Sequence, residues 1–124
     1  MAADVGGVYD AEKLRFDHHQ RTFTHVWREG DAKLPHVKLS SAGLIYKHYG
    51  KEVIKNACSQ VWNQVLSEEE LCLVHEKLYK KLILEIDAID NGVNICDGEQ
   101  RYQIGTGLAT RVGRYNYDWN QDKD

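Results

Sequence analysis

The chain has 124 residues, the length of one domain, and can bury a core without disulfides or metal ions. Hydrophobic residues make up 42% and charged residues 28%, as in soluble globular proteins, and a net charge of −3 excludes a strongly basic, non-specific nucleic-acid binder. Three cysteines without a CxxC pair exclude a disulfide framework and a zinc finger, and the lack of a long apolar run predicts a soluble, intracellular chain without membrane contact.

The N-terminal residues predict a strand that ends in a glycine-rich turn. Residues 4–7 read as the end of this strand, with Gly6 and Gly7 in the turn. In open α/β sheets, ligands bind outside the carboxyl ends of strands, so Asp4 stands where a metal-binding carboxylate is expected. A frayed N-terminus is the alternative interpretation.

A second strand is predicted over 14–16, after a polar connection at 9–15, and it leads into Asp17, His18 and His19. On a strand, two adjacent histidines point to opposite faces of the sheet. At a strand end, one ring can hold a metal ion while the other reaches a substrate. The carboxylate beside them can orient a ring by accepting its second N–H. The alternative is a polar surface turn.

A loop is expected over 21–39, long enough to be functional or mobile. Ser40 or Ser41 can cap the helix that follows, near 41–66, in which Gly50 interrupts the pattern. Apolar residues recur there with a helical period, which predicts a buried face. The residues of this face are Leu44, Ile45, Tyr49, Val53, Ile54, Ala57, Cys58, Val61, Trp62 and Val65. His48 is expected on the helix surface.

Ser67 and Glu70 form a capping box, which predicts the start of a long helix over 67–90 that stops at Gly92. Its expected core face consists of Leu71, Val74, Leu78, Leu82, Ile86 and Ile89.

Asp87 and Asp90 lie in the last turn of this predicted helix, where the helix dipole favours cations. The cost, roughly 0.3–1 kcal/mol per charge, suggests a compensating ion nearby. Asp90 is nearer the apolar face and is the better candidate for an inward ligand, but Asp87 is kept as the alternative ligand.

The C-terminal part predicts a loop over 94–107, with room for a short strand at 102–104, and a helix over 106–115. Arg111 and Arg114 lie three residues apart on one face of that helix. An exposed pair is usually solvated, but guanidinium groups that face the Asp-His cluster would bind phosphate oxygens. Arg21, beside the histidines, is a third candidate for substrate binding.

These motifs together resemble the DHH phosphoesterase superfamily and, within it, the melanocyte-proliferating-gene protein family. A lone Asp-His-His motif is a weak signal, but the combination is specific, and the likeness runs from Asp4 to Asn120. The segments that carry it are 4–10, 15–21, 38–46, 87–92 and 111–114. Members of that family are described as metal-dependent hydrolases and as RNA exonucleases of the nucleus and mitochondria.

The resemblance implies a role for each residue of the motif. Asp4 would be a carboxylate that bridges two metal ions, and His18 a ligand of one ion with Asp17 behind it. His19 would contact the substrate phosphate, and the segment 87–90 would supply a further carboxylate. The metals would be Mn²⁺ or Mg²⁺, which accept carboxylate-rich sites with some imidazole. The reaction would be attack of a metal-activated hydroxide on phosphorus.

The resemblance also implies missing parts, because the family's first motif, with ligands for the other metal, and its C-terminal domain have no counterpart here. We therefore expect residues 1–124 to be a partial domain of the α/β class, helix-rich, with short parallel strands. Such a chain would bind metal weakly, be inactive alone and form a homodimer. The dimer contact would use the strand edge near Val5 and Phe16 or the 53–65 helix.

Two other functions fit the same residues. One is a non-catalytic helical interaction domain that retains half of a metal site. The other is a DHH enzyme that acts on small phosphates such as pyrophosphate or dinucleotides.

Overall fold

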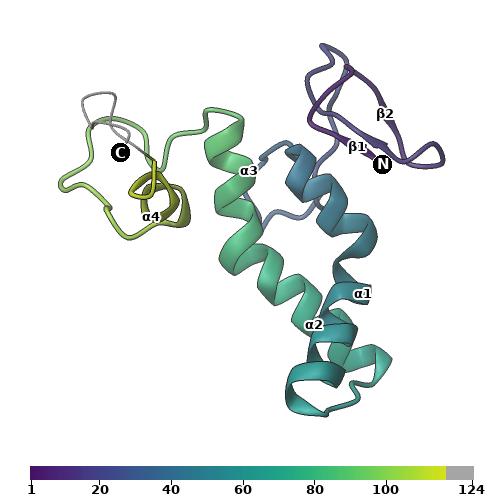
Figure 1. Ribbon diagram of the computed structural model, residues 1–124. Coiled ribbons are helices and arrows are strands. Elements are labelled where there is room, and N and C mark those ends of the chain that lie inside the picture. The colour runs from purple at the N-terminus through teal and green to yellow at the C-terminus, as the bar shows by residue number, and fades with distance from the viewer. Residues whose placement is uncertain (117–124) are drawn as a thin grey trace, which may run out of the picture. The chain divides into compact units, whose positions relative to one another are not determined.

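The chain divides into two compact units, residues 1–93 and 94–124, and the computed structural model describes residues 1–116. The end of the family likeness at Asn120 lies outside the described residues. The first unit holds a small sheet beside the start of a long helix, α1 (Ser41–Trp62), and a second helical segment runs antiparallel to α1 (Figure 1). This arrangement is the predicted α/β class.

The sheet has three very short strands in the order β1-β3-β2. They are β1 (Ala2–Ala3), β2 (Tyr9–Asp10) and β3 (Arg15–Phe16). The parallel pairing of β1 with β3 confirms the predicted strand pair. β2 was not predicted: it lies in the expected connection and pairs antiparallel with β3. The turn between them is closed by Asp10, whose carboxylate accepts a hydrogen bond from the Lys13 N–H.

Helix α1 (Ser41–Trp62) is continuous through Gly50. Ser40 is its N-cap and accepts a hydrogen bond from the Gly43 N–H, which decides between the two candidate caps. Gly50 does not break the helix. It is buried, and a Cβ there would collide with Tyr46 and His75, so glycine serves close packing at this position.

The second helical segment is divided into α2 (Glu68–Leu78), η1 (Tyr79–Ile83) and α3 (Leu84–Asp90). The predicted capping box of Ser67 and Glu70 is confirmed by both of its hydrogen bonds. The predicted helix over 67–90 forms as one unbroken helical segment from Glu68 to Asp90, but η1 is a π-helical turn within it, which was not predicted. A π turn inserts extra length into the α-helical period and so rotates α3 relative to α2.

The buried residues of this segment differ from the predicted core face. Leu71 is buried as predicted, but Leu78, Leu82 and Ile89 are 36%, 38% and 52% exposed. The buried positions are instead Leu71, His75, Tyr79 and Asp87.

The predicted core face of the first helix is also partly wrong. Leu44 and Ile54 are buried, but Val53, Val61, Trp62 and Val65 are 63%, 69%, 64% and 88% exposed. The main core cluster consists of Phe16, Phe23, Leu39, Leu44 and Tyr79. The strands and the 21–39 loop thus cover only the first half of α1, and the second half keeps apolar side chains in solvent.

The second unit contains α4 (Leu108–Gly113), shorter than the helix predicted over 106–115. The short strand at 102–104 does not form. Within residues 1–116, no helix is both long and apolar enough to cross a membrane.

Candidate metal centre

The carboxyl ends of β1 and β3 bring the predicted site residues together. The Ala2 N–H donates to the Leu14 carbonyl and the Asp4 N–H to the Phe16 carbonyl, so the strands end at one edge. Asp4 follows β1 with a φ of 59°, a left-handed conformation that Asp adopts more readily than most residues. Its side chain therefore faces the segment that follows β3.

Four side chains meet at this edge: Asp4, Asp17, His18 and His19. Each offers one ligand atom, and these atoms lie within 4.8 Å of one another. Asp17 is buried, His18 is half-buried, and Asp4 and His19 are exposed. The grouping agrees with the spacing argument from the sequence, while the role of these residues as ligands stays a prediction.

His18 is held on both sides of its ring. Its Nδ1 lies 3.0 Å from the Ser41 Oγ and 3.1 Å from the Ser41 backbone nitrogen. Its Nε2 lies 3.0 Å from the Asp90 Oδ2. The Asp4 Oδ1 is 3.6 Å from Nδ1 and also accepts a hydrogen bond from the Ser41 hydroxyl at 3.3 Å. The long-range contacts to Ser41 and Asp90 fix the orientation of the imidazole.

Asp17 is the partner of His19 rather than of His18, which differs from the expected arrangement. Its Oδ1 lies 2.6 Å from the His19 Nδ1 and accepts from the His19 N–H, and its Oδ2 accepts from the Gly7 N–H at 2.6 Å. Burial alone would raise the pKa of Asp17, but the hydrogen bonds from Gly7 and His19 hold the pKa below its ordinary value.

His19 is charged more easily than a free histidine. Its hydrogen bond to Asp17 raises the pKa, burial opposes that shift, and the nearby charges of Asp17, Asp4 and Asp90 raise the pKa further. The net result is a raised pKa and an exposed ring with Nδ1 occupied by Asp17. The free Nε2 of His19 can therefore present a proton to a ligand.

Asp87 and Asp90, the two alternative candidates for a metal ligand, have different surroundings in the structure. Asp87 is fully buried: its Oδ1 accepts from the Ser40 N–H and hydroxyl at 2.9 and 2.7 Å, and its Oδ2 accepts from the Tyr79 hydroxyl at 2.9 Å. Burial raises the pKa of Asp87, and the hydrogen bonds from Ser40 and Tyr79 oppose this shift. A Cβ at Gly43 would collide with this carboxylate, so glycine makes room for it.

Asp87 thus anchors the start of α1, whereas Asp90 reaches the metal-ligand candidates through His18. The angular argument from the sequence placed Asp90 nearer the core than Asp87. That part was wrong, because Asp87 is fully buried and the Asp90 side chain is 47% exposed.

The three arginines proposed for substrate binding are exposed. Arg21 follows the histidines in the first unit. Arg111 lies in α4, and Arg114 follows that helix and donates to the Gly105 carbonyl at 2.9 Å within the second unit. Their role in phosphate binding stays a prediction.

A cavity of about 300 Å³ opens beside the proposed ligands. Asp4, Ser41 and Asp90 contribute to its wall, together with apolar atoms of Ile45 and Ile86. The cavity is large enough for several waters or a phosphate group next to the carboxylates.

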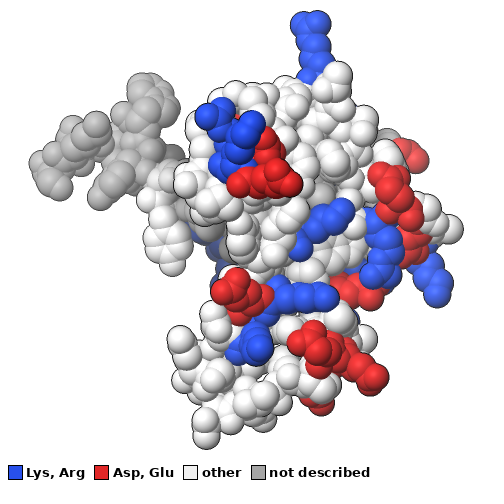
Figure 2. All heavy atoms as spheres, turned by 90° about the vertical axis from the view of Figure 1, so that its right-hand side faces the viewer, with Lys and Arg blue, Asp and Glu red and all other residues white. Residues whose placement is uncertain are grey.

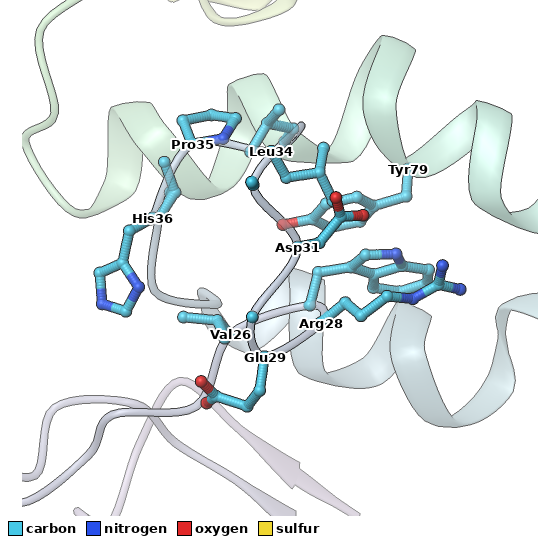
Figure 3. A pocket seen from close by; sticks show the side chains of 13 residues that line it. Val26, Arg28, Glu29, Asp31, Leu34, Pro35, His36 and Tyr79 are labelled. Atoms are coloured by element: carbon cyan, nitrogen blue, oxygen red, sulfur yellow. The ribbon is translucent and has the colours of Figure 1, made fainter.

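The loop predicted over 21–39 is confirmed as irregular structure, with one bridge between Val26 and Lys38. It encloses a second cavity of about 270 Å³ against η1, and Figure 3 shows Leu34, Asp31 and Tyr79 around this space. Trp27 stacks on Tyr79 with ring centroids 4.0 Å apart. None of the four side chains at the strand ends lines this cavity.

Sequence reasoning missed Ser41 as a site residue. Its position in the 38–46 segment indicated only a helix cap, and its contacts with His18 and Asp4 depend on where α1 begins in space. Only the family likeness of the 38–46 segment marked this region as more than a helix start.

Comparison with known proteins identifies the family. The family model MYG1_exonuc, described as "Uncharacterised protein family (UPF0160)", matches residues 1–124. The chain is 46% identical over 126 residues to the MYG1 protein of Dictyostelium discoideum. It is 42% identical over 124 residues to a MYG1 protein of Caenorhabditis elegans and 39% identical over 127 residues to the MYG1 exonuclease of Homo sapiens.

These matches cover 100% of the chain but only 35%, 35% and 33% of the three relatives, so the chain spans about a third of their length. No solved structure matches the chain. The family match over every residue confirms the family that the motifs predicted: the chain belongs to the MYG1 family.

Proposed function

We propose that this chain carries part of the metal-dependent phosphodiesterase site of a DHH-type nuclease that hydrolyses RNA with Mn²⁺ or Mg²⁺. The observation that carries the proposal is the cluster of Asp4, Asp17, His18 and His19, whose ligand atoms lie within 4.8 Å of one another, with Asp90 at the His18 Nε2. The name of the human relative, MYG1 exonuclease, supports a nucleic acid as the substrate.

The donor set fits a hard divalent cation. Carboxylates with some imidazole suit Mn²⁺ and Mg²⁺. Neighbouring ligands of an octahedral ion at about 2.1 Å are about 3.0 Å apart, and the His18 Nε2 and Asp90 Oδ2 are 3.0 Å apart. Asp4 offers a further carboxylate at the other ring nitrogen of His18, whereas buried Asp87 accepts three hydrogen bonds from the protein and fits a structural role.

Local charge supports the need for a metal. The net charge is −3, and the face drawn in Figure 2 mixes Lys and Arg with Asp and Glu rather than presenting a basic track. A bound divalent ion would polarise a phosphate oxygen and neutralise charge that develops on it.

His19 would donate a proton in the reaction. Asp17 holds its ring through Nδ1, so Nε2–H can donate to a phosphate oxygen or give its proton to the leaving oxygen. The hydrogen bond to Asp17 raises the pKa of His19, which favours the protonated ring.

A chimera tests the proposal, because the chain is only part of the length of its relatives. Residues 1–124 replace the matching segment of the human relative, and hydrolysis of an end-labelled RNA is followed with and without Mn²⁺. We expect Mn²⁺-dependent hydrolysis that is lost in His18→Ala and His19→Ala and kept in His48→Ala, while residues 1–124 alone show at most trace activity. Hydrolysis that persists in His18→Ala, or without a divalent ion, would overturn the proposal.

A further inference from the structure

A third cavity, of about 280 Å³, is lined by residues of α1, α2 and the 21–39 loop, and none of the four side chains at the strand ends contributes to it. Its charged wall has three cations and one carboxylate: Arg28 from the loop, Lys47 and Lys51 from α1, and Glu76 from α2. The chain as a whole has a net charge of −3, so the cavity is a local excess of positive charge. Such an excess attracts anions.

The charges of the two lysines are not neutralised by a carboxylate. Lys47 and Lys51 are exposed and four residues apart on α1, a spacing at which like charges repel. Within the described residues 1–116, neither lysine forms an ion pair. Glu76 is shared by Arg28 and Lys80, with distances of 3.3 and 3.1 Å. The single carboxylate of the cavity therefore leaves Lys47 and Lys51 free to bind an anion.

Both ammonium groups are held at the cavity by one hydrogen bond each. The Lys47 Nζ donates to the Val26 carbonyl at 3.0 Å, and the Lys51 Nζ donates to the Cys72 Sγ at 3.1 Å. An ammonium group has three N–H donors, so each lysine keeps two for a ligand. Burial lowers the pKa of the neighbouring His75, and the charge of Lys51 lowers it further, so the field of this lysine acts inside the cavity.

A phosphate group of a nucleic-acid strand matches this wall. Phosphate oxygens accept several charge-assisted hydrogen bonds, and Lys and Arg commonly supply them. Trp27 also lines the cavity, and grooves that combine cations with aromatic side chains are typical of single-strand binding. Both elements that carry the cations start at the proposed metal centre, because the loop follows His19 and α1 begins at Ser41. Lys47 and Lys51 follow Ser41 on that helix by roughly 9 and 15 Å along its axis.

We propose that this cavity is a phosphate subsite for the RNA strand, in which Arg28, Lys47 and Lys51 hold a backbone phosphate apart from the proposed metal centre. The inference rests on the proposed function, because that function names RNA as the ligand. Contacts to the backbone carry no sequence information, so the binding is the same for different bases and weakens as the salt concentration rises.

Alkylation of the cysteines in the unchanged chain tests the location. Cys72 lines the cavity and is exposed, whereas Cys96 is exposed in the second unit. In EDTA, a saturating single-stranded RNA should slow the reaction of Cys72 with iodoacetamide several-fold and leave Cys96 unchanged. Mass spectrometry of the peptides measures both rates. No slowing at Cys72, or equal slowing at both cysteines, would overturn the inference.

The salt dependence of RNA binding tests the lysines. Lys47→Gln and Lys51→Gln each remove one charge and retain a hydrogen-bond donor. Fluorescence anisotropy in EDTA should show weaker binding of labelled oligo(U) and oligo(A) alike, with the slope of log K against log salt reduced by about 0.7 for each lysine. Lys77→Gln, at an exposed position of α2 outside this cavity, should bind like the unchanged chain. Unchanged slopes in the two cavity variants, or the same reduction in Lys77→Gln, would contradict the proposal.

Inorganic phosphate tests whether the ligand is a strand or a free phosphate. At fixed ionic strength and equal concentration of phosphate groups, it should not displace the RNA. Displacement would assign the cavity to a free phosphate, and the assignment to RNA would be wrong.

The two proposals fail separately, because the binding assays contain no metal ion. If the chimera hydrolyses RNA with Mn²⁺ but the variants of Lys47 and Lys51 bind RNA like the unchanged chain, only the phosphate subsite is wrong. If the chimera shows no hydrolysis while RNA protects Cys72, the nuclease proposal is wrong and the cavity is still an RNA site.

Discussion

The carboxylate of Asp17 binds the ring of His19, with Oδ1 2.6 Å from Nδ1, although His18 is the nearer residue in sequence. The His18 ring, whose centroid is 4.3 Å from that of His19, is held instead by Ser41 and Asp90. The Asp-His-His motif therefore splits into a carboxylate–imidazole pair and a single imidazole with distant partners. Under the proposed function, His19 would supply a proton and His18 would hold the metal ion.

The first prediction concerns the protonation of His19. Asp17→Asn removes the charge that stabilises the imidazolium, so the pKa of His19 should fall from its raised value. Titration of the ring Cε1–H resonance measures this pKa. Asp10→Asn, which removes a carboxylate paired with Lys13, is the control and should leave the titration of His19 unchanged. An unchanged pKa in Asp17→Asn would show that the pair does not form in solution.

The second prediction concerns the ligands of the metal. Residues 1–124 should bind Mn²⁺ weakly, since two or three protein ligands leave water at the remaining positions of the ion. His18→Ala should abolish this binding. His48→Ala should not, because His48 contacts the Tyr9 hydroxyl rather than the cluster. Calorimetry or Mn²⁺ electron paramagnetic resonance measures the affinity, and equal loss in both variants would place the site elsewhere.

The third prediction separates the two carboxylates of the last helical turn. Asp87→Ala leaves the buried donors of Ser40 and Tyr79 without an acceptor, so the free energy of unfolding should fall by about 2–4 kcal/mol. Asp90→Ala should change it by less than about 0.5 kcal/mol, as is usual at exposed sites, yet weaken Mn²⁺ binding. Urea unfolding and calorimetry together test this contrast, and the reverse pattern would exchange the two roles.

The fourth prediction concerns His75, which is buried between Trp27 and Tyr46. Burial lowers its pKa below the ordinary value of 6.5, a hydrogen bond to the Tyr46 carbonyl opposes this shift, and the charge of Lys51 adds to the lowering. The unfolded chain therefore takes up the proton first as the pH falls.

The stability that neutral His75 contributes is present above pH 6.5 and is lost as the pH falls through its lower, folded-state pKa. Urea midpoints between pH 7.5 and 5 should decline more in the unchanged chain than in His75→Gln. The comparison cancels the titration of His19 and Asp17, which are common to both proteins. Parallel declines would mean that His75 is not held neutral.

The fifth prediction concerns self-association. Val53, Val61, Trp62 and Val65, in the second half of α1 and just after it, are all more than 60% exposed, and exposed apolar surface can mark an association site. β2 pairs with the open side of β3, so we expect the α1 surface rather than the strand edge at Phe16 to form a dimer.

Light scattering over a concentration series measures this association. Trp62→Lys should shift the chain to the monomer, whereas Gln60→Lys, which adds the same charge but removes no apolar surface, should not. A chain that stays monomeric at millimolar concentration would contradict this prediction.

Local patterns in the sequence determined the parts of the molecule that depend on neighbouring residues. The Ser67–Glu70 capping box and the glycine-rich turn after the first strand depend on contacts within a few positions. The parallel strands also followed, because adjacent strand ends place Asp4 beside the histidines.

Tertiary structure decided what depends on distant residues. The π turn at Tyr79–Ile83 rotates α3, buries Asp87 against Ser40 and leaves Asp90 at His18. A 3.6-residue period cannot anticipate this rotation, since it assumes an uninterrupted α-helix. Ser41 became part of the site for the same reason: its partners His18 and Asp4 are far away in sequence, and only the packing of α1 on the sheet brings them together.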